Sequence, residues 1–133
     1  MDSIKLLQFH AAVAAGLGLK FPVQLADVLA NPTPRLLAAR VSVGPENRYN
    51  PHVTLRSQGS KTPLWLIHPG MGEILVFMPL SSYFNDRPIY ALRPKGLDGG
   101  EHFKNIPEVV QLYYEAVVKA QPTGPYAILG YSL

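Results

Sequence analysis

The sequence contains no cysteine among its 133 residues. It therefore offers no disulfide framework, no cysteine-based zinc site and no thiol nucleophile. No apolar run reaches the roughly 18 to 20 residues that a membrane-spanning helix needs. The amino terminus also lacks the basic start and the apolar core of a signal peptide. We therefore expect a protein of the reducing cytoplasm without a membrane partner.

Charged residues are few and evenly spread. They make up 16% of the chain, and 12 basic against 9 acidic residues give a formal net charge of +3. Because Lys and Arg form no run, we expect no nucleic-acid partner and no anionic-membrane surface. His10, His52 and His68 show no metal-ligand spacing, and no metal site is expected. Hydrophobic residues amount to 47%, which predicts that most of the chain folds.

Apolar residues recur at helical spacing near the amino terminus. They predict an amphipathic helix over residues 2–17, which a polar residue at its start can cap. A second apolar stretch, residues 23–29, stops at residues 31–34, because proline supplies no N–H and disfavours helix in the preceding residue. A short helix is then expected over residues 35–41. The residues with helical spacing in the first helix are Leu6, Phe9, Val13 and Leu17.

The pattern changes twice further along the chain. Residues 42–62 are interrupted every few positions by Gly, Pro, Asn or Ser, and we predict a linker there. From Pro63 onward, short apolar runs alternate with helical patterns, which predicts a parallel α/β sheet with three strands. The expected strands cover residues 64–68, 89–92 and 126–129, and the expected helices cover residues 73–83 and 107–120.

The last four residues, Gly130-Tyr131-Ser132-Leu133, match a G-x-S-x-G nucleophile elbow up to its final glycine. This motif places a serine on a tight turn between a buried strand and a helix. A serine hydroxyl becomes nucleophilic when a histidine takes its proton and a carboxylate orients that histidine. In an α/β-hydrolase both partners follow the serine in the chain. The alternative is an incidental G-x-S in a turn.

A second motif, His68-Pro69-Gly70-Met71-Gly72, follows the first predicted strand of the α/β region. A glycine-rich turn after a buried strand is where an oxyanion hole needs free backbone N–H groups. An ordinary strand-to-helix turn is the alternative interpretation. Together with the elbow, this turn predicts an incomplete α/β-hydrolase.

Three segments resemble the thioesterase domains that terminate nonribosomal peptide synthetases. They read LWLIHPGMGE from residue 64, RPIYALR from residue 87 and GPYAILGYS from residue 124. The resemblance implies that Ser132 is the catalytic nucleophile that accepts the acyl group. It also implies that the backbone at Gly70 and Met71 forms half of the oxyanion hole, and that the N–H of Leu133 forms the other half.

The region before the linker resembles the second half of an acyl or peptidyl carrier domain. In that family an Asp-Ser-Ile at a helix start carries 4'-phosphopantetheine on the serine, which implies that Ser3 is the attachment site. A phosphate ester suits a helix N-terminus, although a simple N-cap is the alternative role for Ser3. The expected organisation is therefore a partial carrier domain of helices at residues 1–41, a linker at 42–62 and the N-terminal part of a thioesterase domain at 63–133.

More narrowly, residues 72–77 and 83–88 resemble fungal synthetases of the atromentin and terrequinone type, built from adenylation, carrier and thioesterase domains. Those enzymes join two aryl pyruvic acid units. The implied partners are an acyl thioester of an aryl pyruvic acid, an adenylation domain and a phosphopantetheinyl transferase. The implied function is transfer of the acyl group to Ser132, followed by release or dimerising condensation.

The triad Asp and His would follow Leu133 in this family's chain order, so we expect the 133-residue chain to be inactive by itself. A non-catalytic remnant or an interaction module is the alternative function.

Overall fold

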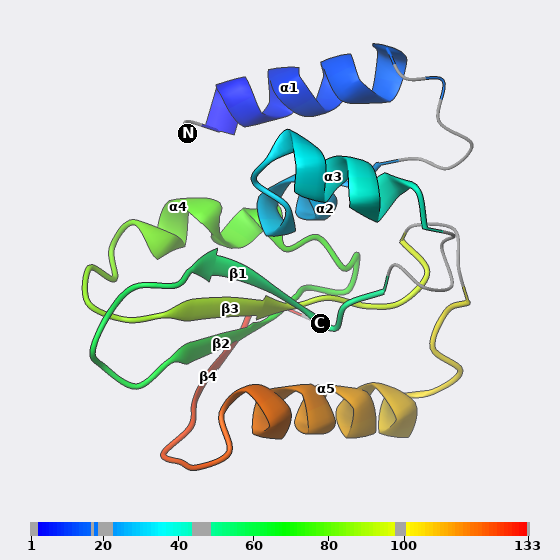
Figure 1. The fold of residues 1–133 in the computed structure, drawn as a ribbon. Coiled ribbons are helices and arrows are strands. Elements are labelled where there is room, and N and C mark those ends of the chain that lie inside the picture. The colour runs from blue at the N-terminus through cyan, green and yellow to red at the C-terminus, as the bar shows by residue number, and fades with distance from the viewer. Residues whose placement is uncertain (1–2, 17, 19–22, 44–48, 98–100, 133) are drawn as a thin grey trace. The chain divides into compact units, whose positions relative to one another are not determined.

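The computed structural model describes residues 3–16, 18, 23–43, 49–97 and 101–132 (Figure 1). The chain divides into two compact units. The helical unit comprises residues 1–49 and 95–101, and the sheet unit comprises residues 50–94 and 102–133. None of the helices in the described ranges is long and apolar enough to cross a membrane.

The described residues of the helical unit form three helices. They are α1 (Ser3–Gly16), α2 (Leu25–Ala30) and α3 (Pro34–Val41). The hydroxyl of Thr33 caps α3 by accepting a hydrogen bond from the backbone N–H of Leu36, and proline occupies the first turn. The predicted helix over residues 35–41 is therefore confirmed, and that over 2–17 is confirmed for its described part. The identity of this unit as a partial carrier domain stays a prediction.

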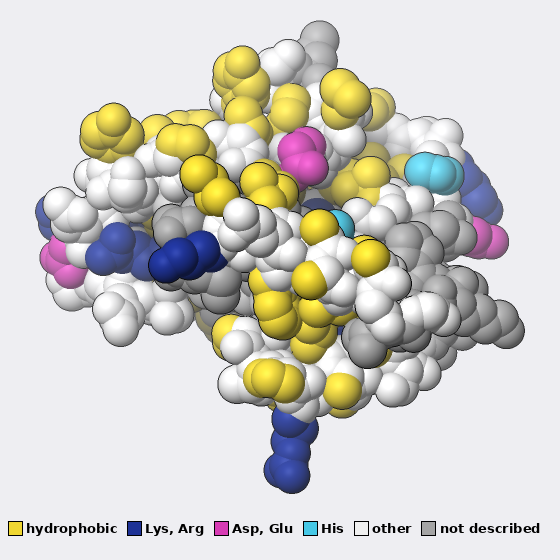
Figure 2. All heavy atoms as spheres, turned by 90° about the horizontal axis from the view of Figure 1, so that it is seen from above, with side chains coloured by type: hydrophobic (Ala, Val, Ile, Leu, Met, Phe, Trp, Pro, Cys, Tyr) yellow, Lys and Arg dark blue, Asp and Glu magenta, His cyan; other side chains and the backbone are white. Residues whose placement is uncertain are grey.

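α1 buries less of its apolar surface than the spacing of its residues predicted. Val13 packs against a small core that contains Val23, Val28 and Leu37. Phe9, a member of the same predicted stripe, is 42% exposed. Hydrophobic side chains, coloured yellow, also reach the surface on the face drawn in Figure 2. Among the described residues of α1, the large apolar side chains that are exposed are Ile4, Leu7 and Phe9.

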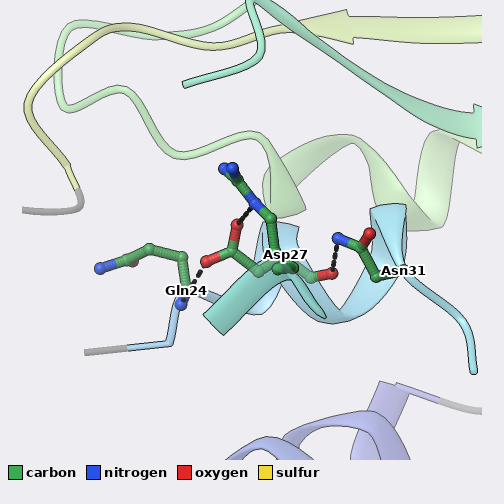
Figure 3. Close-up of polar contacts among 4 residues, drawn as sticks. Gln24, Asp27 and Asn31 are labelled. Atoms are coloured by element: carbon green, nitrogen blue, oxygen red, sulfur yellow. Dashed lines mark hydrogen bonds and ion pairs between the residues drawn. The ribbon is translucent and has the colours of Figure 1, made fainter. Parts of the chain in front are cut away.

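A buried carboxylate joins the two short helices (Figure 3). Asp27 is 1% exposed, and its Oδ2 accepts a hydrogen bond of 3.0 Å from the backbone N–H of Gln24. Its Oδ1 accepts a second bond, also 3.0 Å long, from Nε of Arg40 in the last turn of α3. The Asn31 amide donates to the Asp27 carbonyl at 2.8 Å. These contacts fix α2 against α3 through an ion pair.

The sheet unit contains a four-stranded mixed sheet with the order β1-β3-β2-β4. β2 (Leu64–Ile67) pairs in parallel with β3 (Ile89–Leu92) and with β4 (Ala127–Gly130). These strands lie within one residue of their predicted positions. β1 (His52–Arg56) pairs antiparallel with β3. The α/β prediction is therefore right for three strands, whereas the prediction of a purely parallel, three-stranded sheet is wrong.

β1 lies inside residues 42–62, where a linker was predicted, so the linker prediction is wrong for this strand. The strand is short, it has turn residues on both sides, and a register shift interrupts its pairing between Thr54 and Arg56. Val53 is 1% exposed while Thr54 faces solvent, which is the alternation of a half-buried strand. The hydrogen bonds that hold β1 come from β3, far along the chain, and a local pattern carries no information about that partner.

The helices of the sheet unit lie on opposite faces of the sheet, α4 on one and α5 on the other (Figure 1). The helix predicted over residues 73–83 is reduced to a 3-10 turn, η2 (Leu75–Phe77), followed by α4 (Met78–Ser81). Pro79 accounts for the break between the two, because it donates no backbone hydrogen bond to the preceding turn. α5 (Ile106–Ala120) begins at the predicted place, where the Asn105 side chain caps its first turn.

α5 packs on the sheet through a compact core. Trp65 of β2 is fully buried there, and its Nε1–H donates to Oε1 of Gln121 at 2.9 Å. Because the core combines residues of β2, β3 and α5, it holds β2 against the helix. The buried members of this core are Trp65, Leu92, Tyr113, Ala116 and Val117.

Candidate active site

The register of two parallel strands brings both sequence motifs to the same edge of the sheet. β2 and β4 are hydrogen-bonded neighbours, and Ile67 lies opposite Gly130. The glycine-rich turn follows β2 directly, and Ser132 stands two residues beyond the end of β4. Neighbouring strands are about 4.8 Å apart. The candidate nucleophile and the turn expected to form the oxyanion hole therefore leave the sheet at the same level on adjacent strands.

Ser132 has an unusual backbone conformation. Its φ is +59°, and it is the only non-glycine residue with a positive φ in the part of the chain that the structure describes. A non-glycine residue in this region costs about 1–3 kcal/mol and is found preferentially at functional sites. A strained turn at the serine is also what a nucleophile elbow requires. Ser132 is exposed, while Leu133 lies outside the described residues.

The glycine-rich segment forms a tight turn. The carbonyl of Pro69 accepts a hydrogen bond of 2.8 Å from the N–H of Gly72, whose φ is +77°. Gly70 and Met71 occupy the exposed corner of this turn. Their two N–H groups have no hydrogen-bond partner among the described residues. Exposed backbone donors held by a fixed turn are the groups that an oxyanion hole uses.

His68 lies between the end of β2 and this turn, and both of its ring nitrogens have partners. Nδ1 is 2.7 Å from the Pro69 carbonyl oxygen, and Nε2 is 2.7 Å from the hydroxyl of Tyr113 on α5. The ring is therefore not free to serve as the general base for Ser132. Sequence reasoning assigned no role to His68 and did not single out Tyr113. The two residues are 45 positions apart, so no local motif links them.

A largely apolar cavity of about 520 Å³ adjoins these groups in the sheet unit. Ser132 and His68 contribute to its wall, together with apolar side chains of α5 and β4. Val110, Tyr114 and Ile128 are 60%, 63% and 60% exposed, so the cavity is open to solvent. The described ranges contain no group of three or more His, Asp or Glu side chains that could hold a metal ion. The Ser132 hydroxyl is the candidate nucleophile at the wall of this cavity.

Ser3, the predicted attachment site for 4'-phosphopantetheine, is the first residue of α1. A helix start is the position that the resemblance to a carrier domain requires. The role of Ser3 itself stays a prediction.

Comparison with known proteins identifies the family. The family model described as "Thioesterase domain" matches residues 62–133, which is more than half of the chain. A nonribosomal peptide synthetase of Ascocoryne sarcoides is 47% identical over 99% of the chain, and the aspulvinone E synthetase of Aspergillus terreus is 43% identical over 98% of it. The chain spans 14% of the length of each of these two relatives.

Solved structures agree with this family. The NocB thioesterase domain, in covalent complex with a fluorophosphonate nocardicin G analogue, matches 61% of the chain with a TM-score of 0.56 and 28% identity. The match covers 37% of that domain. A four-domain nonribosomal peptide synthetase bound to AMP and glycine matches 92% of the chain and 9% of its own length, with a TM-score of 0.59 and 28% identity. The chain therefore belongs to the thioesterase domain family, and it is similar over nearly its whole length to fungal nonribosomal peptide synthetases.

Proposed function

We propose that Ser132 is the acyl-accepting nucleophile of a thioesterase domain that works within a synthetase resembling a nonribosomal peptide synthetase. The observation that carries the proposal is the positive φ of Ser132. Ser132 follows β4, and the neighbouring strand β2 leads into the turn that exposes the N–H groups of Gly70 and Met71. The family match over residues 62–133 supports the same chemistry.

In the proposed reaction the Ser132 hydroxyl oxygen attacks the carbonyl carbon of an acyl thioester. Negative charge develops on the carbonyl oxygen, and the N–H groups of Gly70 and Met71, with that of Leu133, donate hydrogen bonds to it. The carbon–sulfur bond then breaks, the pantetheine sulfur leaves as a thiol with the proton that the Ser132 hydroxyl gave up, and the acyl group remains on Ser132 as an ester. Attack on this ester by water or by a second acyl unit releases the product. We propose an aryl pyruvic acid as the acyl group.

We further propose that residues 1–41 are part of the carrier domain that delivers this thioester. Similarity to the fungal synthetases and to the four-domain synthetase extends through this region. Ser3, at the start of α1, would carry the 4'-phosphopantetheine that a phosphopantetheinyl transferase attaches. An adenylation domain would supply the activated acid.

His68, the histidine that lines the same cavity as Ser132, has both ring nitrogens engaged by other partners. We therefore propose that the 133-residue chain alone does not turn over thioesters. Hydrolysis of an acyl N-acetylcysteamine thioester should proceed at the same rate with the chain, with its Ser132→Ala variant and with buffer. Release that depends on Ser132 would contradict this part of the proposal.

The nucleophile is best tested in a synthetase that supplies the remaining groups. Residues 1–133 would replace the aligned segment of the aspulvinone E synthetase, with which they share 43% identity. The graft should form aspulvinone E, and Ser132→Ala should lower the rate by about a thousandfold or more. Ser3→Ala should prevent loading of the acyl group, which intact-protein mass spectrometry detects.

Two results would refute the nucleophile proposal. One is a Ser132→Ala graft that forms product at the rate of the unmodified graft. The other is a graft that keeps Ser132 and becomes loaded with the acyl thioester, yet never releases it.

A further inference from the structure

His68 and Tyr113 form a connected pair of hydrogen bonds that ends on the glycine-rich turn. From α5, the Tyr113 hydroxyl contacts Nε2 of His68, and Nδ1 of His68 contacts the Pro69 carbonyl oxygen. The two rings stand nearly perpendicular, with centroids 5.9 Å apart. We infer that His68, oriented by Tyr113, is a positioning residue that aims the Gly70 N–H at the developing oxyanion. This inference rests on the function proposed above.

The direction of each hydrogen bond follows from the chemistry of the partners. A carbonyl oxygen only accepts, so Nδ1 of His68 must carry the proton that it shares with Pro69. In a neutral imidazole the other nitrogen is then an acceptor. The Tyr113 hydroxyl must therefore donate to Nε2. Hydrogen bonds are therefore donated from Tyr113 to His68 and from His68 to the carbonyl of Pro69. This arrangement requires the tautomer of His68 that carries its proton on Nδ1.

The geometry of the peptide bond connects this chain to the oxyanion hole. The Pro69 carbonyl and the Gly70 N–H belong to one planar, trans peptide unit, so they point in opposite directions. The carbonyl accepts two hydrogen bonds, one from His68 and one from the N–H of Gly72. Fixing the carbonyl therefore fixes the direction of the Gly70 N–H. Tyr113, which is 6% exposed in the core, anchors the arrangement to the body of the sheet unit.

The first test uses the 133-residue chain and needs no catalysis. At a pH where His68 is neutral, ¹⁵N NMR should show a protonated Nδ1 and an unprotonated Nε2. Tyr113→Phe removes only the hydroxyl, and it should shift the amide resonances of Gly70 and Met71. Phe103→Leu is the matched control, since Phe103 contacts the same tyrosine ring edge-on. The opposite tautomer, or equal shifts in both variants, would overturn the inference.

The second test measures release by the aspulvinone synthetase graft. Loss of one oxyanion donor typically costs about a hundredfold to a thousandfold in kcat, so His68→Leu should lower kcat by about a hundredfold and leave KM unchanged. His68→Asn, which offers an amide N–H near the position of Nδ1, should recover most of that loss. If Ser132→Ala has no effect, the proposed function fails. If Ser132 is required but His68→Leu retains full kcat, or His68→Asn is no better than His68→Leu, only the positioning role fails.

Discussion

Gln121 accepts a hydrogen bond from the only tryptophan of the chain, Trp65. Replacing Gln121 by alanine tests the packing of the sheet unit. Its side-chain Oε1 accepts the Nε1–H of Trp65, which is fully buried. Its Nε2 donates to the carbonyls of Thr123 and Pro125 at 3.2 and 2.9 Å, at exposed positions in the turn that leads to β4. Gln121→Ala therefore leaves one buried donor unsatisfied and two carbonyls that water can reach.

The expected loss follows from these environments. An unsatisfied buried donor costs about 1–3 kcal/mol, whereas exposed carbonyls regain hydrogen bonds from water. We expect Gln121→Ala to lower the free energy of unfolding of the sheet unit by about 2 kcal/mol. Native-state hydrogen exchange of the β2 and α5 amides measures this quantity in every variant.

A double-mutant cycle assigns the loss to the indole. Trp65→Phe removes the donor, so Gln121→Ala should cost much less in that background, with a coupling energy of about 1–2 kcal/mol. An equal loss of unfolding free energy on Gln121→Ala, whether residue 65 is Trp or Phe, would refute the assignment to the indole.

Three further predictions concern stability. Burial lowers the pKa of His52 from its ordinary value of 6.5, so the unfolded state binds the proton more tightly. The free energy of unfolding should therefore fall as the pH drops below about 6.5. Urea titrations between about pH 7 and 5 measure how steeply this free energy depends on pH in the wild type and in His52→Gln. An equal pH dependence in the two proteins would contradict the prediction. Gly59 has φ +135°, and a Cβ atom built on it would collide with the backbone of Asp86 and Arg87. Gly59→Ala should therefore lower the free energy of unfolding by about 1–3 kcal/mol. Gly130→Ala is the control, because nothing lies within 4 Å of its Cβ position, and equal thermal midpoints for the two variants would refute the prediction. Asp27→Asn should destabilise the helical unit by about 3 kcal/mol. This is the low end of the range for a broken buried ion pair, because the Arg40 side chain is 16% exposed. Hydrogen exchange of the α2 and α3 amides measures the loss, and unchanged protection would contradict the prediction.

The sequence predicts the parts of the fold that depend on local patterns. β2, β3 and β4 are apolar runs bounded by proline or glycine, and α5 has an amphipathic stripe that begins at Pro107, so these elements are found where expected. β1 is held by pairing with β3, and its two apolar residues between turn signals resemble a linker. Pro79 lies in the first turn of α4 and separates this helix from the 3-10 turn before it.

The candidate site likewise contains groups that local sequence motifs predict and a contact that they do not predict. Ser132 and the Gly70–Met71 turn are adjacent in sequence to strands, so motif and context together predict them. The bond between His68 and Tyr113 joins two elements 45 residues apart, and it depends on how α5 packs on β2. Such a contact follows from tertiary structure alone, and a single sequence contains no signal for it.

The proposed function depends above all on the transfer of the acyl group to Ser132. The most direct measurement is peptide mass spectrometry of the aspulvinone synthetase graft, quenched in acid during turnover. We expect an added acyl mass, attached as an ester, on the peptide that contains Ser132, and no added mass on that peptide in the Ser132→Ala graft. Product release with the acyl group on another residue, or with no acyl group on Ser132 at any time, would contradict the account.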